Sequence, residues 1–325
     1  MNVNQLKDKD DIVESNMRGN DFLTIADYTA SEIHYLLKLA SQLKKKQKLG
    51  IPHDYLKGKT LGMVFEKSST RTRISFEVGM FQLGGHASFL SATDLQLGRG
   101  ESISDTAKVL SRYLDGVMIR TFSHETIEEF AAEATVPVIN GLTDLHHPAQ
   151  VLADLLTIYE DKGKLNGLKL CYVGDGHNNM THSLMEGAAK TGMNMVVASP
   201  EGYEPNSNIY LNARKTADLH GGTLNFTYDP EEAAKQADII ITDVWASMGQ
   251  EHEQKKRIES LTPYQVNESL CEKAKDDFIF LHCLPAHRGE EVTEQIIDGK
   301  HSLVFDEAEN RLHAQKALLK VLIGD

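Results

Sequence analysis

The sequence predicts an α/β protein with two doubly wound parallel-sheet domains joined by inter-domain helices. Short apolar runs typical of buried strands alternate with amphipathic helical patterns, and this alternation favours parallel sheets covered by helices. The alternation occurs in two separate series along the chain. A length of 325 residues also suits two domains of ordinary size, each able to bury its own core.

Composition and charge exclude several classes of protein. Hydrophobic residues make up 41% of the chain and charged residues 25%, which are globular values, and no apolar run is long enough to span a membrane. The segment Met1 to Asn20 is polar and resembles neither a signal peptide nor a transit peptide. We therefore expect a cytoplasmic protein with no membrane partner. The net charge of −13 also disfavours a nucleic-acid partner.

The first series starts with a helix over residues 29–46, where Thr29 and Glu32 match a capping box. Apolar runs predict strands at 61–65, 87–90, 116–119 and 136–139, with helices over 71–84, 104–114 and 126–134 between them. The helix over 71–84 rests on the spacing of Ile74, Val78, Phe81 and Leu83.

The second series follows a helix that begins at Pro148 and connects the two domains. It predicts strands at 169–173, 195–198, 223–227, 238–242 and 278–281, and an amphipathic helix ends the chain. We expect a first domain over residues 1–150 and a second over 151–306. The helix over 307–325 is expected to pack back on the first domain.

An anion site is predicted where the first strand of the first series leads into its helix. Ser69, Thr70 and Thr72 supply hydroxyl donors there, and Arg71 and Arg73 supply guanidinium groups. A helix N-terminus already favours negative charge through its unpaired N–H groups and its dipole, so a phosphate would fit. The alternative is an ordinary Ser or Thr cap beside solvated arginines.

Further polar residues follow the other strands of the first series. Arg120 ends the strand at 116–119, and it is either a ligand contact or a surface arginine. His147 and Gln150 lie at the start of the helix that begins at Pro148, where they could bind a carbonyl or phosphoryl oxygen and an amide-like group. Adjacent histidines at 146 and 147 also raise the possibility of a metal site, but no regularly spaced carboxylate accompanies them.

The second series presents three candidate residues at strand ends. Asn179 follows the turn Gly174-Asp175-Gly176, which resembles a dinucleotide-binding turn but lacks its third glycine. Asp243 could hold an ammonium group or cap the following loop. Cys283 is either a buried structural residue or a group that orients substrate, because no nucleophile signature surrounds it. Cys171, Cys271 and Cys283 lack C-x-x-C spacing, so reduced thiols are expected and structural zinc is not.

These motifs resemble those of the aspartate and ornithine carbamoyltransferases. Ser69-Thr70-Arg71-Thr72-Arg73 is similar to the family's carbamoyl-phosphate signature. The resemblance covers nearly the whole chain, because further segments match in the same order: His147-Pro148-Ala149-Gln150, Asp243-Val244-Trp245-Ala246-Ser247-Met248-Gly249, His282-Cys283-Leu284-Pro285 and residues 306–313.

The resemblance implies a set of ligand contacts. Carbamoyl phosphate would be bound by Ser69, Thr70, Arg71, Thr72, Gln96, Arg120, His147, Gln150, Cys283, Leu284 and Arg311, and ornithine by Asn179, Asp243, Ser247 and Met248. Catalytic roles would fall to Arg120, His147, Cys283 and Thr72. The family assembles as homotrimers with shared active sites, so Gln96 would come from a neighbouring subunit, and higher assembly of trimers stays open. Neither a metal nor an organic cofactor is implied.

The implied reaction transfers a carbamoyl group from carbamoyl phosphate to the side-chain amine of L-ornithine, giving L-citrulline and phosphate in arginine metabolism. Aspartate is disfavoured as acceptor, because aspartate carbamoyltransferases lack Ser247-Met248-Gly249. Putrescine stays open, because putrescine carbamoyltransferases resemble the chain over residues 288–292. An NAD-dependent oxidoreductase and a non-catalytic binding protein are the alternatives of other classes.

Overall fold

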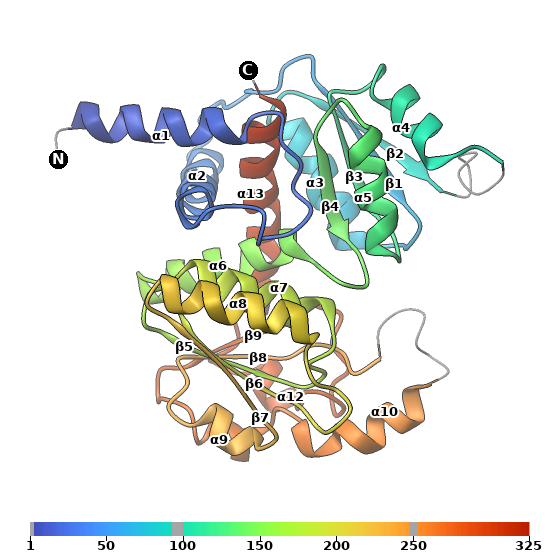
Figure 1. Ribbon diagram of the computed structural model, residues 1–325. Helices are drawn as coiled ribbons and strands as arrows, with labels where there is room; N and C mark the ends of the chain where they lie inside the picture. The colour runs from blue at the N-terminus through green and yellow to red at the C-terminus, as the bar shows by residue number, and fades with distance from the viewer. Residues whose placement is uncertain (1–2, 93–99, 247–252, 325) are drawn as a thin grey trace. The chain divides into compact units, whose positions relative to one another are not determined.

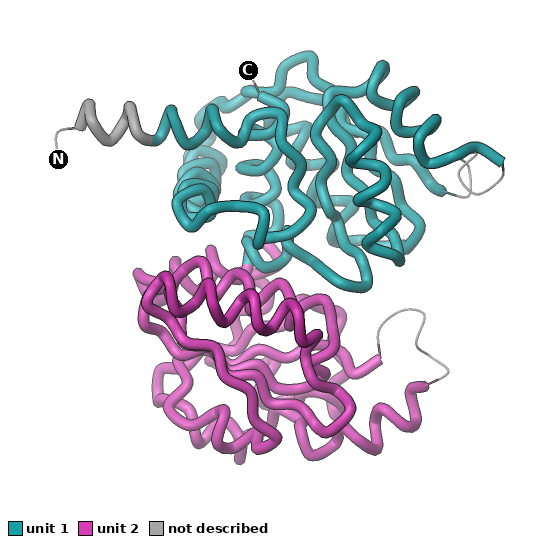
Figure 2. Tube along the Cα trace, in the orientation of Figure 1, with its two compact units in different colours: residues 1–153, 310–325 teal, residues 154–309 magenta. Residues whose placement is uncertain are grey.

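The computed structural model of the chain describes residues 3–92, 100–246 and 253–324. It divides into two compact units, one of residues 1–153 with 310–325 and the other of residues 154–309 (Figure 2). Each unit contains one parallel sheet with helices on its faces (Figure 1). The predicted fold class, two α/β domains with doubly wound parallel sheets, is therefore confirmed.

The first unit is built on a four-stranded parallel sheet with the order β2-β1-β3-β4. Helices α4 and α5 pack on one face through a core that includes Val64, Val117, Ile127 and Phe130, while α3 and α13 (Val304–Ile323) lie on the other face (Figure 1). The elements are α1 (Val3–Met17), α2 (Ala30–Lys48), β1 (Thr60–Phe65), α3 (Thr70–Gln82), β2 (His86–Ser91), α4 (Ile103–Leu110), β3 (Gly116–Arg120), α5 (His124–Glu133), β4 (Val138–Leu142) and α6 (Pro148–Lys162).

The second unit is built on a five-stranded parallel sheet with the order β7-β6-β5-β8-β9. Its elements are β5 (Lys169–Val173), α7 (Asn179–Lys190), β6 (Asn194–Ala198), α8 (Ser207–Leu219), β7 (Thr223–Thr227), α9 (Pro230–Ala234), β8 (Ile239–Ile241), α10 (Gln254–Leu261), the 3₁₀ helix η2 (Thr262–Tyr264), α11 (Glu268–Cys271), β9 (Ile279–Leu281) and α12 (Glu294–Ile297). Helices α6 and α13 each contribute residues to both units.

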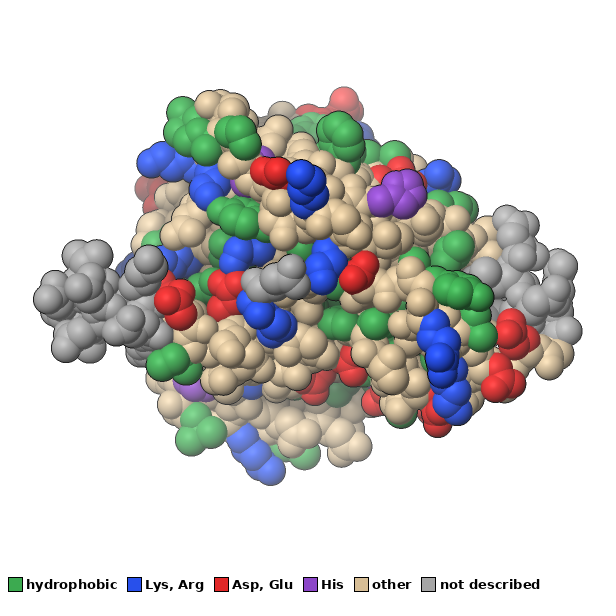
Figure 3. All heavy atoms as spheres, turned by 90° about the horizontal axis from the view of Figure 1, so that it is seen from above, with side chains coloured by type: hydrophobic (Ala, Val, Ile, Leu, Met, Phe, Trp, Pro, Cys, Tyr) green, Lys and Arg blue, Asp and Glu red, His purple; other side chains and the backbone are tan. Residues whose placement is uncertain are grey.

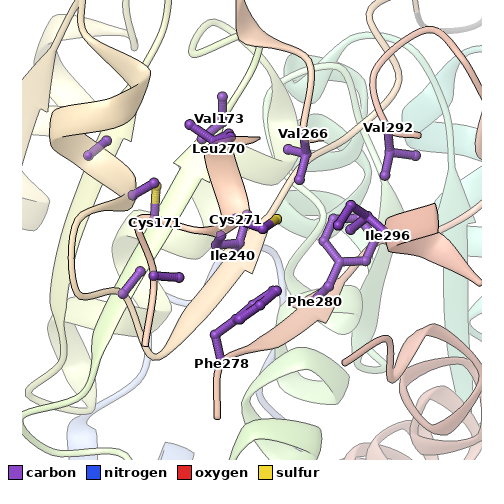
Figure 4. Packing of buried hydrophobic residues seen from close by; sticks show 14 of the residues in the cluster. Cys171, Val173, Ile240, Val266, Leu270, Cys271, Phe278, Phe280, Val292 and Ile296 are labelled. Carbon is purple, nitrogen blue, oxygen red and sulfur yellow. The ribbon is translucent and has the colours of Figure 1, made fainter. Parts of the chain in front are cut away.

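The core of the second unit forms between its sheet and helices α9, α11 and α12. Figure 4 shows Ile240 and Phe280 of two neighbouring strands beside Cys271 and Ile296 of the covering helices. Burial raises the pKa of Cys171 to about 12, and burial likewise raises that of Cys271 to about 12, so both thiols are protonated and unreactive at neutral pH. All three cysteines are free.

The local structure differs in part from the expectations. Helix α1 was not predicted, and β4 runs from Val138 to Leu142 rather than over 136–139. Ile74 and Phe81 are 50% and 80% exposed, because α3 turns Phe76, Gly79 and Met80 inward instead. Lys44, near the end of α2, is buried and donates to Asn310 at 2.7 Å.

The surface bears on the expected partners. Among the described residues, none of the helices has both the length and the apolar character needed to cross a membrane. On the face shown in Figure 3, acidic and basic side chains are interspersed among apolar and neutral ones.

Candidate functional site

The candidate residues of the first unit lie at the carboxyl ends of its strands. The strand order runs outward from β1 in one direction to β2 and in the other to β3, which makes the carboxyl ends of β1 and β3 the switch point of the sheet. The Ser69–Thr72 segment follows β1, and Arg120 ends β3. His147 follows the neighbouring strand, β4, and directly precedes α6.

Arg311 of α13 joins this group through hydrogen bonds. Its guanidinium donates to Thr72 Oγ1 at 3.1 Å and also to Gln150 Oε1. Gln315, with its amide oxygen turned toward Arg311, accepts from Arg311 Nε at 3.3 Å and donates to Ser75. All three predicted residues, Thr72, Gln150 and Arg311, are less than 4% exposed. The structure therefore brings them together from three helices.

His147 lies within the electrostatic influence of three arginines. Burial first, and then the charges of Arg311, Arg120 and Arg71, hold the pKa of His147 well below its ordinary value of 6.5. The imidazole is therefore neutral at neutral pH. A neutral imidazole surrounded by guanidinium groups can donate a hydrogen bond to an anion without itself adding charge. The predicted Arg71, Arg120, His147 and Arg311 thus form one positively charged group.

At the start of α3 the structure shows the ordinary cap that was the alternative to an anion site. Ser69 caps the helix, because its hydroxyl accepts from Thr72 N at 3.2 Å. Arg73 turns away, since it pairs with Glu77 at 2.9 Å and lies 3.9 Å above the ring of Phe89. Only one of the two arginines in this segment, Arg71, therefore acts on the group around His147.

A buried lysine that sequence reasoning missed ties the strand-end loops together. Lys67 lies two residues after the end of β1, pairs with Asp144 in the loop after β4, and lies 4.1 Å above the ring of Phe122 in the loop after β3. Asp144 N also donates to Phe122 O at 2.8 Å. The position of Lys67 near Ser69 was the available sign in the sequence that it belongs to the site. Its partners Phe122 and Asp144 are 55 and 77 residues further along the chain.

The candidate residues of the second unit also lie around a switch point, between β5 and β8. Asp243, which follows β8, accepts from Asn178 Nδ2 at 2.9 Å and from its neighbour Val244 N at 2.8 Å. Cys283, which follows β9, donates its thiol hydrogen to Asp243 Oδ1 at 3.1 Å. Asn179, the first residue of α7, is half-buried. A buried carboxylate with neutral donors around it suits a cationic group of a ligand.

Cys283 is unsuited to act as a nucleophile in this setting. Burial, followed by the charges of Asp243 and Glu307, raises its pKa well above the ordinary value of 9.0. Because the thiolate is the reactive form, the protonated thiol is restricted to hydrogen bonding. Neither of the roles considered from the sequence, a buried structural residue or a group that orients substrate, requires a thiolate.

The loop that carries Cys283 and Leu284 is held by a buried histidine. His282 Nδ1 accepts from Leu284 N at 2.9 Å, so the other ring nitrogen carries the hydrogen and faces Glu291 Oε1 at 3.2 Å. His282 N donates to Glu307 at 2.9 Å. Leu284 adopts a left-handed φ of 56°, which turns the chain sharply after the thiol.

Comparison with known proteins identifies the family. Residues 20–160 match the family described as aspartate/ornithine carbamoyltransferase, carbamoyl-P binding domain, and residues 166–322 match its Asp/Orn binding domain. The chain belongs to the aspartate/ornithine carbamoyltransferase family. It is 64% identical over 312 residues to an ornithine carbamoyltransferase of Oceanobacillus iheyensis, covering 96% of this chain and 97% of the relative.

Solved structures in this family agree with the fold. The ornithine carbamoyltransferase of Pyrococcus furiosus is 55% identical, with a TM-score of 0.92 over 94% of this chain and 98% of that one. The ornithine transcarbamoylase of Giardia lamblia is 34% identical, with a TM-score of 0.86 over 94% and 99% of the two chains. A Pyrococcus furiosus relative at 55% identity is described as anabolic.

Sequence reasoning also missed Arg257 of α10. This buried guanidinium donates to Trp245 O and to the carboxylate of Asp175, and it lies 5.2 Å from the ring centroid of Tyr203. Asp175 is therefore occupied by a protein cation, in the turn that resembled a dinucleotide-binding motif. Arg257 lies in a polar stretch typical of a solvated helix, so the sequence does not indicate that this arginine is buried.

Three predicted ligand residues, Gln96, Ser247 and Met248, lie outside the described residues. Within the described part of the chain, two groups have donor atoms close enough to hold a metal ion: Asp243 with His282 and Cys283, and His287 with Glu290 and Glu291. In the first group the Cys283 thiol donates a hydrogen bond to Asp243, and in the second Glu291 accepts one from His287 N at 2.6 Å. Because hydrogen bonds already link these residues, we assign no ion to either group.

Proposed function

We propose that the protein transfers the carbamoyl group of carbamoyl phosphate to the side-chain amine of L-ornithine, giving L-citrulline and phosphate in arginine biosynthesis. The observation that carries the proposal is that Arg311 donates to Thr72 and Gln150 while its charge, with those of Arg120 and Arg71, keeps the buried His147 neutral. Their charges suit a phosphate dianion, which the helix N-terminus at Ser69 also favours. The family membership and the names of the relatives support the same reaction.

The proposed roles in the first unit follow from the chemistry of each group. Ser69, Thr70, Arg71 and Thr72 bind the phosphate, while Arg120, His147 and Thr72 donate to the carbamoyl oxygen as it gains negative charge. Gln150 and Arg311 complete the donor site, since an amide oxygen can accept from the carbamoyl NH₂ group. From the family resemblance, Gln96 of a neighbouring subunit and Leu284 also contact carbamoyl phosphate.

The proposed roles in the second unit concern the amine. Asp243 binds the α-ammonium group of ornithine, with Asn179, Ser247 and Met248 as further contacts, and Cys283 lies near the attacking nitrogen. The side-chain amine must attack as the neutral base, because an ammonium has no lone pair. A C–N bond to the carbamoyl carbon forms, the C–O bond to phosphate breaks, and the departing phosphate takes the amine proton.

The assembly and compartment are further parts of the proposal. A homotrimer with shared sites comes from the family resemblance, and the first unit exposes apolar side chains suited to contact between subunits, Ile74 and Phe81 on α3 and Phe89 on β2. A cytoplasmic location fits an enzyme whose thiols are free. A higher assembly of trimers is compatible with the same surface chemistry.

A panel assay tests the proposal. The protein is incubated with carbamoyl phosphate and, separately, with ornithine, putrescine or aspartate, and ureido product and released phosphate are measured. We expect equal amounts of citrulline and phosphate with ornithine and at least ~100-fold lower kcat/KM with putrescine, which keeps both amino groups of ornithine but lacks its carboxylate. Putrescine used as well as ornithine would replace the acceptor, and the absence of any ureido product would refute the transferase.

A further inference from the structure

Helix α13 carries a lysine that is completely buried. Lys316 is 0% exposed, and among the described residues its Nζ is hydrogen-bonded to Gln82 Oε1 at 2.8 Å and His53 Nε2 at 3.1 Å. His53 Nδ1 faces the carbonyl of Ile51 at 2.8 Å, so Nδ1 carries the hydrogen and Nε2 accepts from the ammonium. Both partners are neutral, whereas buried lysines usually have a carboxylate partner.

This arrangement is a poor way to gain stability. Burial lowers the pKa of Lys316 to about 8, because the charged form is disfavoured away from water. Apolar side chains of similar size often stabilise such a position as well as a buried charge does, or better. A buried charge that persists with directional hydrogen bonds can instead specify one packing arrangement out of several.

The packing that Lys316 specifies is the crossing of α13 on α3. The helices meet at Gly79, where an added Cβ would lie 3.4 Å from Lys316 Cγ and 3.7 Å from both Leu312 and Leu319. On the side of this crossing toward the N-terminus of α3, Arg311 donates to Thr72 at 3.1 Å. On the opposite side, Lys316 donates to Gln82, one helical turn beyond Gly79.

The two polar contacts therefore act at opposite ends of one seam. A slip of one residue along an α-helix axis moves a side chain by about 1.5 Å, which is enough to break the hydrogen bond between Arg311 and Thr72. The apolar contacts around Gly79 resist such a slip weakly, because they are not directional. The hydrogen bonds of Lys316 are directional and resist it.

We propose that Lys316 is a positioning residue for carbamoyl phosphate, fixing the register of α13 on α3 so that Arg311 stays against Thr72 and Gln150. The inference rests on the proposed function, because the proposed function makes carbamoyl phosphate the common ligand of Arg311 and Thr72. Lys316 itself contacts no substrate.

The test measures donor binding and turnover in matched variants. Isothermal titration with carbamoyl phosphate alone gives its Kd, and steady-state kinetics give KM for each substrate with the other saturating. We expect Lys316→Met and Gln82→Leu to raise Kd and KM for carbamoyl phosphate about tenfold, with ornithine KM within about twofold of wild type. Gln82→Glu keeps an acceptor for the ammonium and should retain wild-type values. Lys320→Met is the control, because Lys320 also lies on α13 but pairs with Glu14 of α1.

Each outcome bears on a different claim. Unchanged carbamoyl-phosphate Kd in folded Lys316→Met, beside normal binding by wild type, overturns the inference and leaves the proposed function intact. Wild type that binds no carbamoyl phosphate overturns both. If Lys316→Met does not fold, the comparison of Gln82→Leu with Gln82→Glu tests the inference. Equal Kd values for carbamoyl phosphate in these two variants overturn it, and weaker binding in Gln82→Leu alone supports it.

Discussion

The burial of Lys316 predicts a specific dependence of stability on pH. Its pKa falls from an ordinary value of 10.5 to about 8 in the folded protein, because burial disfavours the ammonium. At about 1.4 kcal/mol per pKa unit, the folded state carries a penalty of about 3 kcal/mol wherever Lys316 is charged in both states. Lys316→Met removes this penalty and leaves a side chain of similar size.

The sign of the effect follows from proton binding. Between pH 8 and 10.5 the unfolded chain keeps the lysine proton and the folded chain releases it, so the free energy of unfolding rises with pH. The penalty is complete below the folded pKa and absent above the unfolded one. The unfolding free energy of wild type minus that of Lys316→Met should therefore increase by about 3 kcal/mol across this window.

Chemical denaturation at a series of pH values measures this difference. Other lysines and tyrosines titrate in the same range, but they are common to both proteins and cancel. In Lys316→Met, the loss of a donor to His53 and Gln82 costs about 1–3 kcal/mol per unsatisfied group. That cost does not vary with pH above 8, so it shifts the difference in unfolding free energy by a constant and leaves its pH dependence unchanged. A difference that is flat from pH 8 to 10.5 would refute the reasoning, because Lys316 would then titrate like an exposed lysine.

Four further predictions concern the site. Arg71→Ala should cost at least ~2 kcal/mol of transition-state stabilisation, which is about a 30-fold loss of kcat/KM, and an unchanged kcat/KM would exclude a phosphate contact. Cys283→Ser should weaken use of the amine with the fold intact, so unaltered ornithine KM and kcat would count against that role. His147 should stay neutral in an NMR titration through pH 6.5. Below that pH the free energy of unfolding should fall, because the unfolded chain protonates His147 and the folded chain does not. A titration midpoint of His147 at its ordinary value would contradict its burial among arginines. Lys67→Met should raise KM for carbamoyl phosphate about fivefold by releasing Asp144, and Lys67→Arg should restore it if the ion pair is responsible.

Most strands and helices were predictable because their signals are local. Buried strands such as β5 read as short apolar runs, and the capping box of Thr29 and Glu32 is present as predicted. The inward face of α3 was predicted wrongly, because Ile74 and Phe81 fit the helical period yet Phe76 and Met80 are the buried apolar side chains. The period of a sequence gives the width of an apolar stripe but not which neighbouring element covers it.

Buried charged residues, in the candidate site and around it, were the least predictable from the sequence. Lys44, Lys67, Arg257 and Lys316 all read as surface residues, since long charged side chains are mostly exposed. Each is buried because a partner distant in the chain accepts its hydrogen bonds; Lys44, for example, binds Asn310, 266 residues away. Such partners are invisible to spacing arguments.

The sequence by itself determined which chemical groups stand at the ends of strands, because hydrophobic periodicity places strands and the residues after them are read directly. It therefore supplied the hydroxyls and arginine that follow β1, and also Arg120, His147, Asp243 and Cys283. Only the tertiary structure decided which of these act together. Strand order makes β1 and β3 neighbours, and the seam between α3 and α13 brings Arg311 to Thr72 across 239 residues. The neutral state of His147 and the protonated state of Cys283 were settled in the same way, because desolvation and the charges around a group exist only once the chain is folded.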